Sequence, residues 1–364
     1  MNELLQLENF SVEFKIKRGI GRAVDNVSID VRKDENFGLV GESGCGKTTL
    51  CKAIIQLLPG NGRIASGSAM FQGRDLVSLS KAEISKVRWK SISMIAQSAM
   101  NALDPVYRVE DQIIEAILHH TNATRAKALE RTRELFNLVG LPQSAIGRYP
   151  HQFSGGMRQR AIIAMALALD PQLIIADEPT TALDVIVQAQ ILRRINELRS
   201  RIKGSMIMIT HDISVVAETC DRVAVMYGGN IVEQGGVHQV LLEPFHPYTL
   251  GLRNAFPSIT GARTELVSIP GSPPDIFDPP PGCKFEDRCP FRVDRCAQEQ
   301  PLPEQVGPDH YTACHRLEDH ELMKRAAVER KTWQGTKAAK RLEIQGGYSG
   351  RPTQQKETQG GEPA

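Results

Sequence analysis

The segment from residue 41 to residue 49, GESGCGKTT, constrains the fold of this chain more than any other feature. It fits the pattern G-x-x-x-x-G-K-[ST], follows the apolar run Phe37–Val40, and precedes a helical repeat of apolar residues that begins at Leu50. The glycines let the backbone curl around phosphate oxygens, so that amide N–H groups and a helix N-terminus face the negative charge. The residues predicted to bind nucleotide phosphates are Gly41, Glu42, Ser43, Gly44, Cys45, Gly46, Lys47, Thr48 and Thr49.

A second motif supplies the carboxylates that such a phosphate site needs. The apolar residues Leu173–Ala176 predict a buried parallel strand, and Asp177 follows at its end, where it can hold Mg²⁺. Glu178 can orient or deprotonate an attacking water. Lys47 is predicted to reach the β- and γ-phosphates, and the Thr48 hydroxyl to bind Mg²⁺. Gly-rich turns and acidic strand ends both occur commonly without a ligand. Here the glycine-rich motif precedes the apolar strand and its two carboxylates, and this order predicts ATP hydrolysis.

Composition sets the class of protein without naming a partner. The 364 residues are 41% hydrophobic and 24% charged, with a net charge of +2, which gives no case for nucleic acid as the main partner. The longest apolar run, Ala161–Leu169, is far shorter than the ~20 residues of a membrane helix. The N-terminal stretch MNELLQLENF has no basic region of the kind that begins a signal peptide, so we expect a cytoplasmic protein.

The segments FSGGMRQR at 153–160 and LIIADEPTTALD at 173–184 together resemble the signature motif, second nucleotide motif and D-loop of ABC-type ATPases. Phe153 and Met157 stand where the family more commonly has Leu and Gln. The resemblance runs from residue 4 to about residue 250. It implies an α/β fold: an ABC-type P-loop nucleotide-binding domain with a RecA-like core, an antiparallel β subdomain and a helical insert, followed by a small Cys-containing C-terminal extension.

The same resemblance assigns roles to further residues. Phe14 stands where an aromatic ring stacks on adenine, although Tyr is more usual there. His211 is implied to contact the γ-phosphate and to support Glu178, which makes Lys47, Glu178 and His211 the catalytic set. The remaining implied residues are Gln97 for Mg²⁺ and water, Asp184 for the D-loop, and Ser154, Gly155 and Gly156 for the γ-phosphate bound by the opposite subunit.

Finer motifs point to one group within the family. The segments QSAMNALDP at 97–105, YPHQ at 149–152 and HPYTL at 246–250 resemble the ATPase subunits of oligopeptide, dipeptide and nickel importers. The resemblance implies a peripheral subunit at the cytoplasmic face of the inner membrane. Its implied partners are a second ATPase subunit in a heterodimer, two membrane permeases and an external solute-binding protein. Peptides, nickel chelates and oligosaccharides all remain open as substrates.

Two other functions compete with transport. A soluble ABC ATPase acting on ribosomes or DNA would show a second cassette, a coiled-coil insertion or a strongly basic surface, and the sequence has none of these. A sensor that merely binds ATP would draw its function from a cluster of cysteines near the C-terminus. Energy coupling in an importer is therefore the favoured function.

Four cysteines lie within 32 residues of one another: Cys283, Cys289, Cys296 and Cys314. Disulfides are disfavoured in a reducing cytosol, and clustered cysteines often bind metal. Their spacing lacks the C-x-x-C pairs of common zinc ribbons, so it leaves Zn²⁺, an iron–sulfur cluster or four free thiols open. The resemblance to the C-terminal extension of oligopeptide-importer ATPases favours a [4Fe–4S] cluster.

Changes in composition divide the chain into three parts. We expect a nucleotide-binding domain over residues 1–243, with a helical insert at about 98–165, and a Pro-rich extension with the four cysteines over 244–318. Residues 319–364 are predicted to form a basic helix with a solvated face and a polar, disordered tail.

Overall fold

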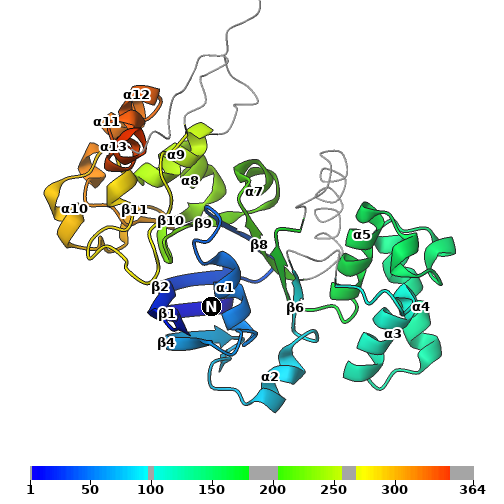
Figure 1. Ribbon diagram of the computed structural model, residues 1–364. Helices are drawn as coiled ribbons and strands as arrows, with labels where there is room; N and C mark the ends of the chain where they lie inside the picture. Colours follow the sequence, from blue (N-terminus) through cyan, green and yellow to red (C-terminus); the bar gives the residue numbers. More distant parts are fainter. Residues whose placement is uncertain (1, 97–101, 180–203, 256–267, 345–364) are drawn as a thin grey trace, which may run out of the picture.

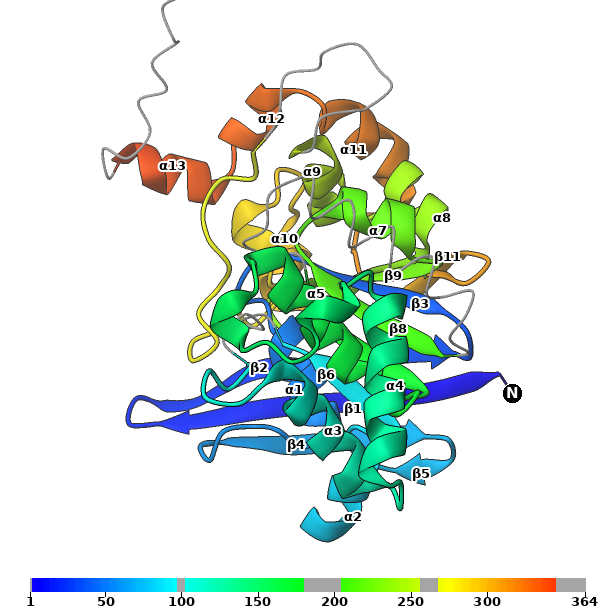
Figure 2. The same ribbon diagram turned by 90° about the vertical axis from the view of Figure 1, so that its right-hand side faces the viewer.

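A computed structural model describes residues 2–96, 102–179, 204–255 and 268–344. Its twelve labelled strands make two sheets, and helices cover the larger sheet and extend from both of its ends (Figures 1 and 2). Within these ranges, no helix is both long enough and apolar enough to span a bilayer.

The smaller sheet is antiparallel and has the strand order β2-β1-β4-β5. Buried positions alternate with more exposed ones along the second half of β2, whereas residues 10–13 of β1 are all buried. In β2 the buried positions include Val27, Ile29 and Val31. Its strands are β1 (Glu3–Ile16), β2 (Gly19–Arg32), β4 (Gly62–Phe71) and β5 (Arg74–Asp75).

The larger sheet has the order β11-β12-β10-β9-β3-β8-β7-β6. From β9 to β6 the neighbours are parallel, whereas β9–β10, β10–β12 and β11–β12 are antiparallel. Every residue of β3 and β7 is buried, as expected for parallel strands covered on both faces. Its strands are β3 (Asn36–Val40), β6 (Ile92–Ile95), β7 (Leu173–Asp177), β8 (Ser205–Thr210), β9 (Arg222–Tyr227), β10 (Asn230–Gly236), β11 (Glu304–Gly307) and β12 (His310–Thr312).

Parallel pairing decides where the sequence motifs meet. Because β3, β7 and β8 run in the same direction side by side, their carboxyl ends lie at one edge of the sheet. The residues that follow these strands, Gly41, Glu178 and His211, therefore come together although they are far apart in the sequence. Ligands of open parallel sheets bind at this kind of edge.

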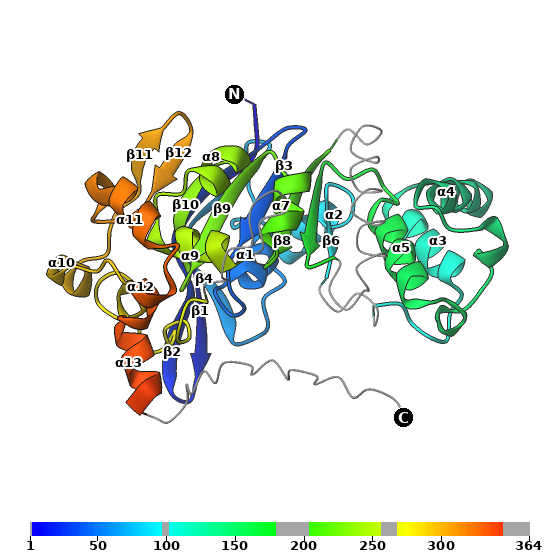
Figure 3. The same ribbon diagram turned by 90° about the horizontal axis from the view of Figure 1, so that it is seen from above.

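Helices on one side of this edge pack together as one unit, and its apolar core continues into the large sheet at Ile174 and Met208. The unit contains α3 (Val109–His120), α4 (Arg125–Leu138) and α5 (Gly155–Ala166), which pack around apolar residues such as Ile113, Phe136 and Ile163. Figures 1 and 3 both show this unit beyond β6, apart from α1 (Lys47–Ile54), the helix that follows the glycine-rich loop. The short helix α2 (Lys81–Val87) lies beside the small sheet and carries a capping box at Ser80.

The C-terminal part packs at the opposite end of the large sheet (Figure 3). Because strand β12 of this part pairs with β10, the C-terminal part belongs to the same sheet as β3 and β7. Tyr227, Tyr248, Phe285, Met323 and Trp333 bury their side chains in one apolar cluster there. The helices of this region are α7 (Ile213–Thr219), α8 (Val237–Leu242), α9 (Pro247–Ala255), α10 (Asp294–Gln298), α11 (His320–Ala326), α12 (Arg330–Gln334) and α13 (Lys337–Ile344).

Candidate nucleotide site

Close packing against two other segments holds the glycine-rich loop between β3 and α1. Gly41 has φ +154°, and a Cβ there would lie 2.1 Å from the carbonyl oxygen of Met226. Gly46 has φ +107°, and a Cβ there would lie 2.3 Å from the carbonyl oxygen of Ala23. Neither position tolerates a side chain, so the sequence pattern of the loop follows from its contacts as well as from its turn.

Lys47 lies over the loop that precedes it. Its side chain is buried, and Nζ donates to the carbonyl oxygens of Gly41 at 2.7 Å and Glu42 at 2.8 Å. The ammonium group is therefore held against the loop that the sequence predicts to bind the β- and γ-phosphates.

Thr48 and Asp177 bring the two nucleotide motifs into contact. Thr48 Oγ1 donates to Asp177 Oδ1 at 2.9 Å, across 129 positions of sequence. Burial raises the pKa of Asp177, although the bond from Thr48 opposes that effect. The second carboxylate oxygen, Oδ2, is buried and has no hydrogen-bond partner among the described residues. A buried, unpartnered carboxylate oxygen beside a threonine hydroxyl fits a hard cation such as Mg²⁺.

Glu178 and His211 form the second pair at the sheet edge. Nδ1 of His211 lies 3.3 Å from Glu178 Oε1. Glu178 has φ +48°, and its backbone N–H donates to the carbonyl oxygen of Ile209 in β8 at 2.9 Å. The Glu178 side chain is 13% exposed and the His211 side chain is 62% exposed, so the carboxylate is largely buried and the imidazole lies at the surface. A carboxylate held this way can orient or deprotonate a water.

The residues Ser154, Gly155 and Gly156 lie in a different place. Ser154 is exposed and caps α5, because its hydroxyl accepts from the backbone N–H of Met157 at 3.3 Å. In Figure 1, α5 lies in the helical unit, apart from α1, the helix that begins at Lys47. One link ties α5 to the second motif: Gln159 Nε2 donates to the carbonyl oxygen of Pro179 at 2.6 Å.

Three further predicted residues differ in what the structure says of them. Phe14 is half-buried in β1, and a Cβ at Gly62 would lie 2.8 Å from its ring. Gln97 and Asp184 lie outside the described residues.

The four cysteines meet in one region of the C-terminal part, but their arrangement does not support the predicted cluster. The backbone N–H of Cys283 donates to the carbonyl oxygen of Cys296 at 2.7 Å. Burial raises the pKa of Cys283 to about 12 and that of Cys314 to about 11, and it raises the pKa of Cys289 well above its usual range. Cys289 lies in the same apolar cluster as Phe285, and the neighbouring cysteines add to the rise in these pKa values.

A metal site would need three or more ligating side chains that converge. Among the residues that the structure describes, no group of His, Cys, Asp and Glu side chains has such an arrangement. The predicted [4Fe–4S] cluster, and Zn²⁺ as its alternative, are therefore not supported.

Sequence reasoning missed two residues that touch the loop from the C-terminal part. The hydroxyl oxygen of Tyr248 accepts from the backbone N–H of Glu42 at 2.9 Å, and Arg288 forms an ion pair with the Glu42 side chain. Tyr248 lies in the motif HPYTL, which the sequence associates with a subfamily and not with the nucleotide. Nothing in the local sequence around Arg288 indicates its contact.

Comparisons with known proteins agree with this site. Residues 24–181 match the family model described as ABC transporter, and residues 232–296 match that of the oligopeptide/dipeptide transporter C-terminal region. The chain is 45% identical over 317 residues to the probable peptide ABC transporter ATP-binding protein y4tR of Sinorhizobium fredii, which covers 86% of this chain and 95% of that protein. The chain belongs to the ABC transporter ATP-binding proteins.

Other members of the ABC family give the same result. The oligopeptide transport ATP-binding protein OppD of Escherichia coli is 44% identical over 86% of this chain and 93% of its own length. A solved ATP-binding cassette, MJ0796 bound to ADP and Pi, matches with a TM-score of 0.58 and 25% identity, over 64% of this chain and 98% of the cassette. The predicted fold class is confirmed, and the protein is an ABC-type ATPase.

Proposed function

We infer that this chain is the ATP-hydrolysing, energy-coupling subunit of a peptide-type ABC importer. The assignment of ATP hydrolysis rests on two pairs of side chains where the parallel strands end. Thr48 donates a hydrogen bond to Asp177, and Glu178 lies beside His211. The names of its relatives, which include dipeptide and oligopeptide transport ATP-binding proteins, support the substrate class.

The chain's own residues divide the work of hydrolysis. We assign the phosphate oxygens to the loop amides and Lys47, since the helix N-terminus and ammonium both favour negative charge. Thr48 and Asp177 would hold Mg²⁺, which when bound neutralises charge on the phosphates. Glu178 would accept a proton from the attacking water, while His211 holds the Glu178 carboxylate in place.

The separation of α5 from the loop supports a site completed by a second subunit. Ser154 caps α5, and its glycines Gly155 and Gly156 leave the helix start open to a phosphate. Within one chain, α5 stands apart from α1, which begins at Lys47 (Figure 3). We propose that it serves the nucleotide of a partner ATPase subunit, in a heterodimer, and that this partner serves the nucleotide of this chain.

The remaining proposals concern the membrane. We propose that the helical unit α3–α5 contacts two permease subunits at the cytoplasmic face of the inner membrane, and that an external solute-binding protein delivers the peptide. The exposed Val106 and Tyr107, just before α3, offer apolar surface for such a contact. Gln97, which precedes this unit, would couple it to the nucleotide.

Replacing Glu178 by Gln tests the hydrolytic assignment. The amide keeps the size of the side chain but cannot accept the proton, so ATP turnover should fall by about 10²-fold or more while Mg·ATP binding persists. Glu134→Gln, a change at an exposed carboxylate on α4, is the matched control. The assignment is wrong if Glu178→Gln turns over ATP within threefold of the unmodified chain.

Peptide uptake by the reconstituted transporter tests the coupling. Proteoliposomes that contain this chain, its ATPase partner and the permeases should import peptide only with the solute-binding protein and ATP. Uptake that survives in the Glu178→Gln variant would contradict the energy-coupling role.

A further inference from the structure

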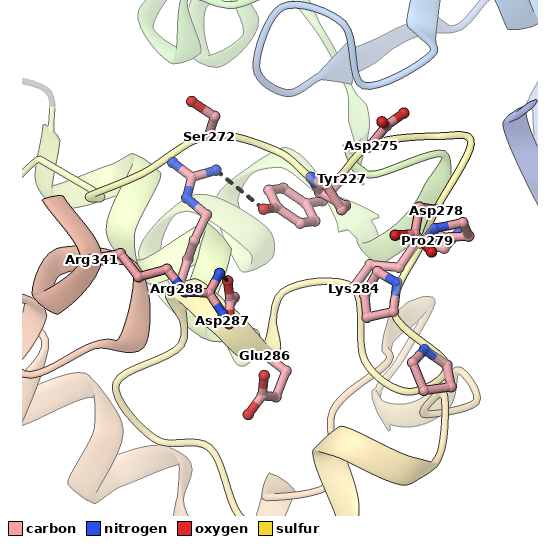
Figure 4. Close-up of a pocket in the computed structure, with 13 residues that line it drawn as sticks. Tyr227, Ser272, Asp275, Asp278, Pro279, Lys284, Glu286, Asp287, Arg288 and Arg341 are labelled. Carbon is pink, nitrogen blue, oxygen red and sulfur yellow. Dashed lines mark hydrogen bonds and ion pairs between the residues drawn. The ribbon is translucent and has the colours of Figure 1, made fainter. Parts of the chain in front are cut away.

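Arg288 is a buried arginine that the nucleotide motifs do not explain. It ends a 3₁₀ turn, Glu286–Arg288, directly before Cys289 in the C-terminal part. Its side chain is 3% exposed and lies on the wall of a cavity of about 380 Å³ beneath the Pro-rich segment 272–281. Figure 4 shows its guanidinium turned toward Tyr227, whereas Arg341 approaches from another element. A buried guanidinium requires partners for its charge.

All five N–H donors of the guanidinium are used. Nη1 donates to Glu42 Oε2 at 2.7 Å and to the Tyr227 hydroxyl at 3.2 Å (Figure 4). Nη2 donates to Glu42 Oε1 at 2.9 Å and to the carbonyl oxygen of Ile269 at 3.3 Å. Nε donates to the carbonyl oxygen of Pro270 at 2.9 Å. Because an arginine has only five such donors, the orientation of Arg288 is fixed on every side.

The bidentate partner, Glu42, is the second residue of the phosphate loop. Its backbone is held as well: the N–H donates to Tyr248 Oη at 2.9 Å, and its carbonyl oxygen accepts from Lys47 Nζ at 2.8 Å. Arg288 and Tyr248 thus fix a residue that in turn contacts the lysine of the site. Fork-to-fork pairs of arginine and carboxylate give both strength and a defined geometry.

Charge explains why this pairing matters for a nucleotide. A carboxylate on a phosphate-binding loop repels the triphosphate, and Glu42 is still 27% exposed in the loop. The guanidinium neutralises that carboxylate and turns both of its oxygens toward the C-terminal part. Lys47 points to backbone carbonyls and not to the carboxylate of Glu42, so it does not serve this purpose.

We propose that Arg288 is a positioning residue for the nucleotide site: its pair with Glu42 removes a repulsive charge from the phosphate loop and fixes the loop's shape. The affinity for ATP then depends on the C-terminal part, through a residue adjacent to Cys289. This inference rests on the proposed function of GESGCGKTT in binding the triphosphate of ATP.

A double-mutant cycle on the full chain separates this role from a merely structural one. The variants are Arg288→Gln, Glu42→Gln and the two together, and the measurement is the Kd of the non-hydrolysable analogue Mg·AMP-PNP by calorimetry, with KM and kcat for ATP. Arg288→Gln should raise Kd and KM about tenfold with kcat changed less, because it leaves a partly screened carboxylate facing the phosphates. In the double variant Kd should fall at least threefold relative to Arg288→Gln alone, since the repulsive charge is gone.

Lys284→Gln is the matched control. Lys284 is buried on the same wall and pairs with Asp25 at 2.8 Å, without touching the loop. Its loss should lower stability but leave Kd within twofold.

Two results would overturn the proposal: Arg288→Gln binding within twofold of the unmodified chain, or a double variant that binds no more tightly than Arg288→Gln. If Arg288→Gln does not fold, Arg288→Lys is compared in the presence and absence of Glu42→Gln. A weakening that is the same in both backgrounds contradicts the role of charge. If the unmodified chain itself fails to bind Mg·AMP-PNP, the proposed function fails instead.

Discussion

Trp333 anchors the last helices of the chain, and its removal tests whether they belong to the folded core. The indole is 1% exposed, and its Nε1 donates to the carbonyl oxygen of Ala327 at 2.9 Å. A Cβ on Gly251 would lie 2.6 Å from the ring, so the indole lies against the backbone of α9. Trp333→Ala would open a cavity between α9 and α12.

The expected cost follows from these contacts. A buried indole removes ~200 Å² from water, which at ~25 cal/mol per Å² corresponds to about 5 kcal/mol. Alanine keeps a part of that burial, and the lost hydrogen bond adds about 1 kcal/mol. Large-to-small changes at fully buried aromatic residues cost about 3–5 kcal/mol, so we expect about 4 kcal/mol.

Amide hydrogen exchange is the decisive assay, because it locates the loss along the chain. Protection should fall in α11 to α13 and α9, while β3, β7 and β8 keep theirs. Trp333→Phe, which fills most of the space but lacks the N–H donor, should cost only about 1–2 kcal/mol. A cost below 1 kcal/mol for Trp333→Ala, or an equal loss of protection throughout the chain, would refute the reasoning.

Two further changes probe the site. Gly46→Ala should raise the Kd for Mg·ATP at least tenfold, since φ +107° and the carbonyl of Ala23 both exclude a Cβ. Gly44→Ala is the comparison, because Gly44 has φ +81° but open space around it. That change should cost only about 1–2 kcal/mol of stability. Equal effects of the two on Kd would show that the close approach is unimportant. Gln159→Ala should lower the free energy of unfolding by about 1–3 kcal/mol, because the buried carbonyl of Pro179 loses its donor; denaturant titration that shows no change would contradict this.

Local patterns account for much of the fold. The alternating residues 4–14 and 24–31 lie in β1 and β2, and the apolar run 173–176 lies in β7. Periodic apolar residues at 109–119 and 124–139 lie in α3 and α4. The periodicity of apolar residues predicts these segments because each strand or helix buries one face, or both faces in the case of β7. The strand–loop–helix around GESGCGKTT forms in the same way.

Contacts between distant segments could not be predicted in this way. Glu233 of β10 pairs with Thr312 of β12, 79 positions later, and the partner of Arg288 lies 246 positions away. No periodicity encodes such a distance. The charges of the basic segment after residue 319 predict a solvated helix, yet the side chains of Met323, Ala327 and Trp333 in this segment are buried. The four cysteines show another limit, because their spacing left the metal open and the [4Fe–4S] cluster that the family resemblance favoured is not supported by the described residues.

The pairing of β12 with β10 has a consequence for how the protein can be divided. Without β11 and β12, the outer side of β10 would present unpaired N–H and C=O groups to solvent. Bare edges of this kind recruit strands from other molecules. A fragment that ends at residue 243 would therefore be prone to edge-to-edge association, because it lacks the strand that covers this side of β10.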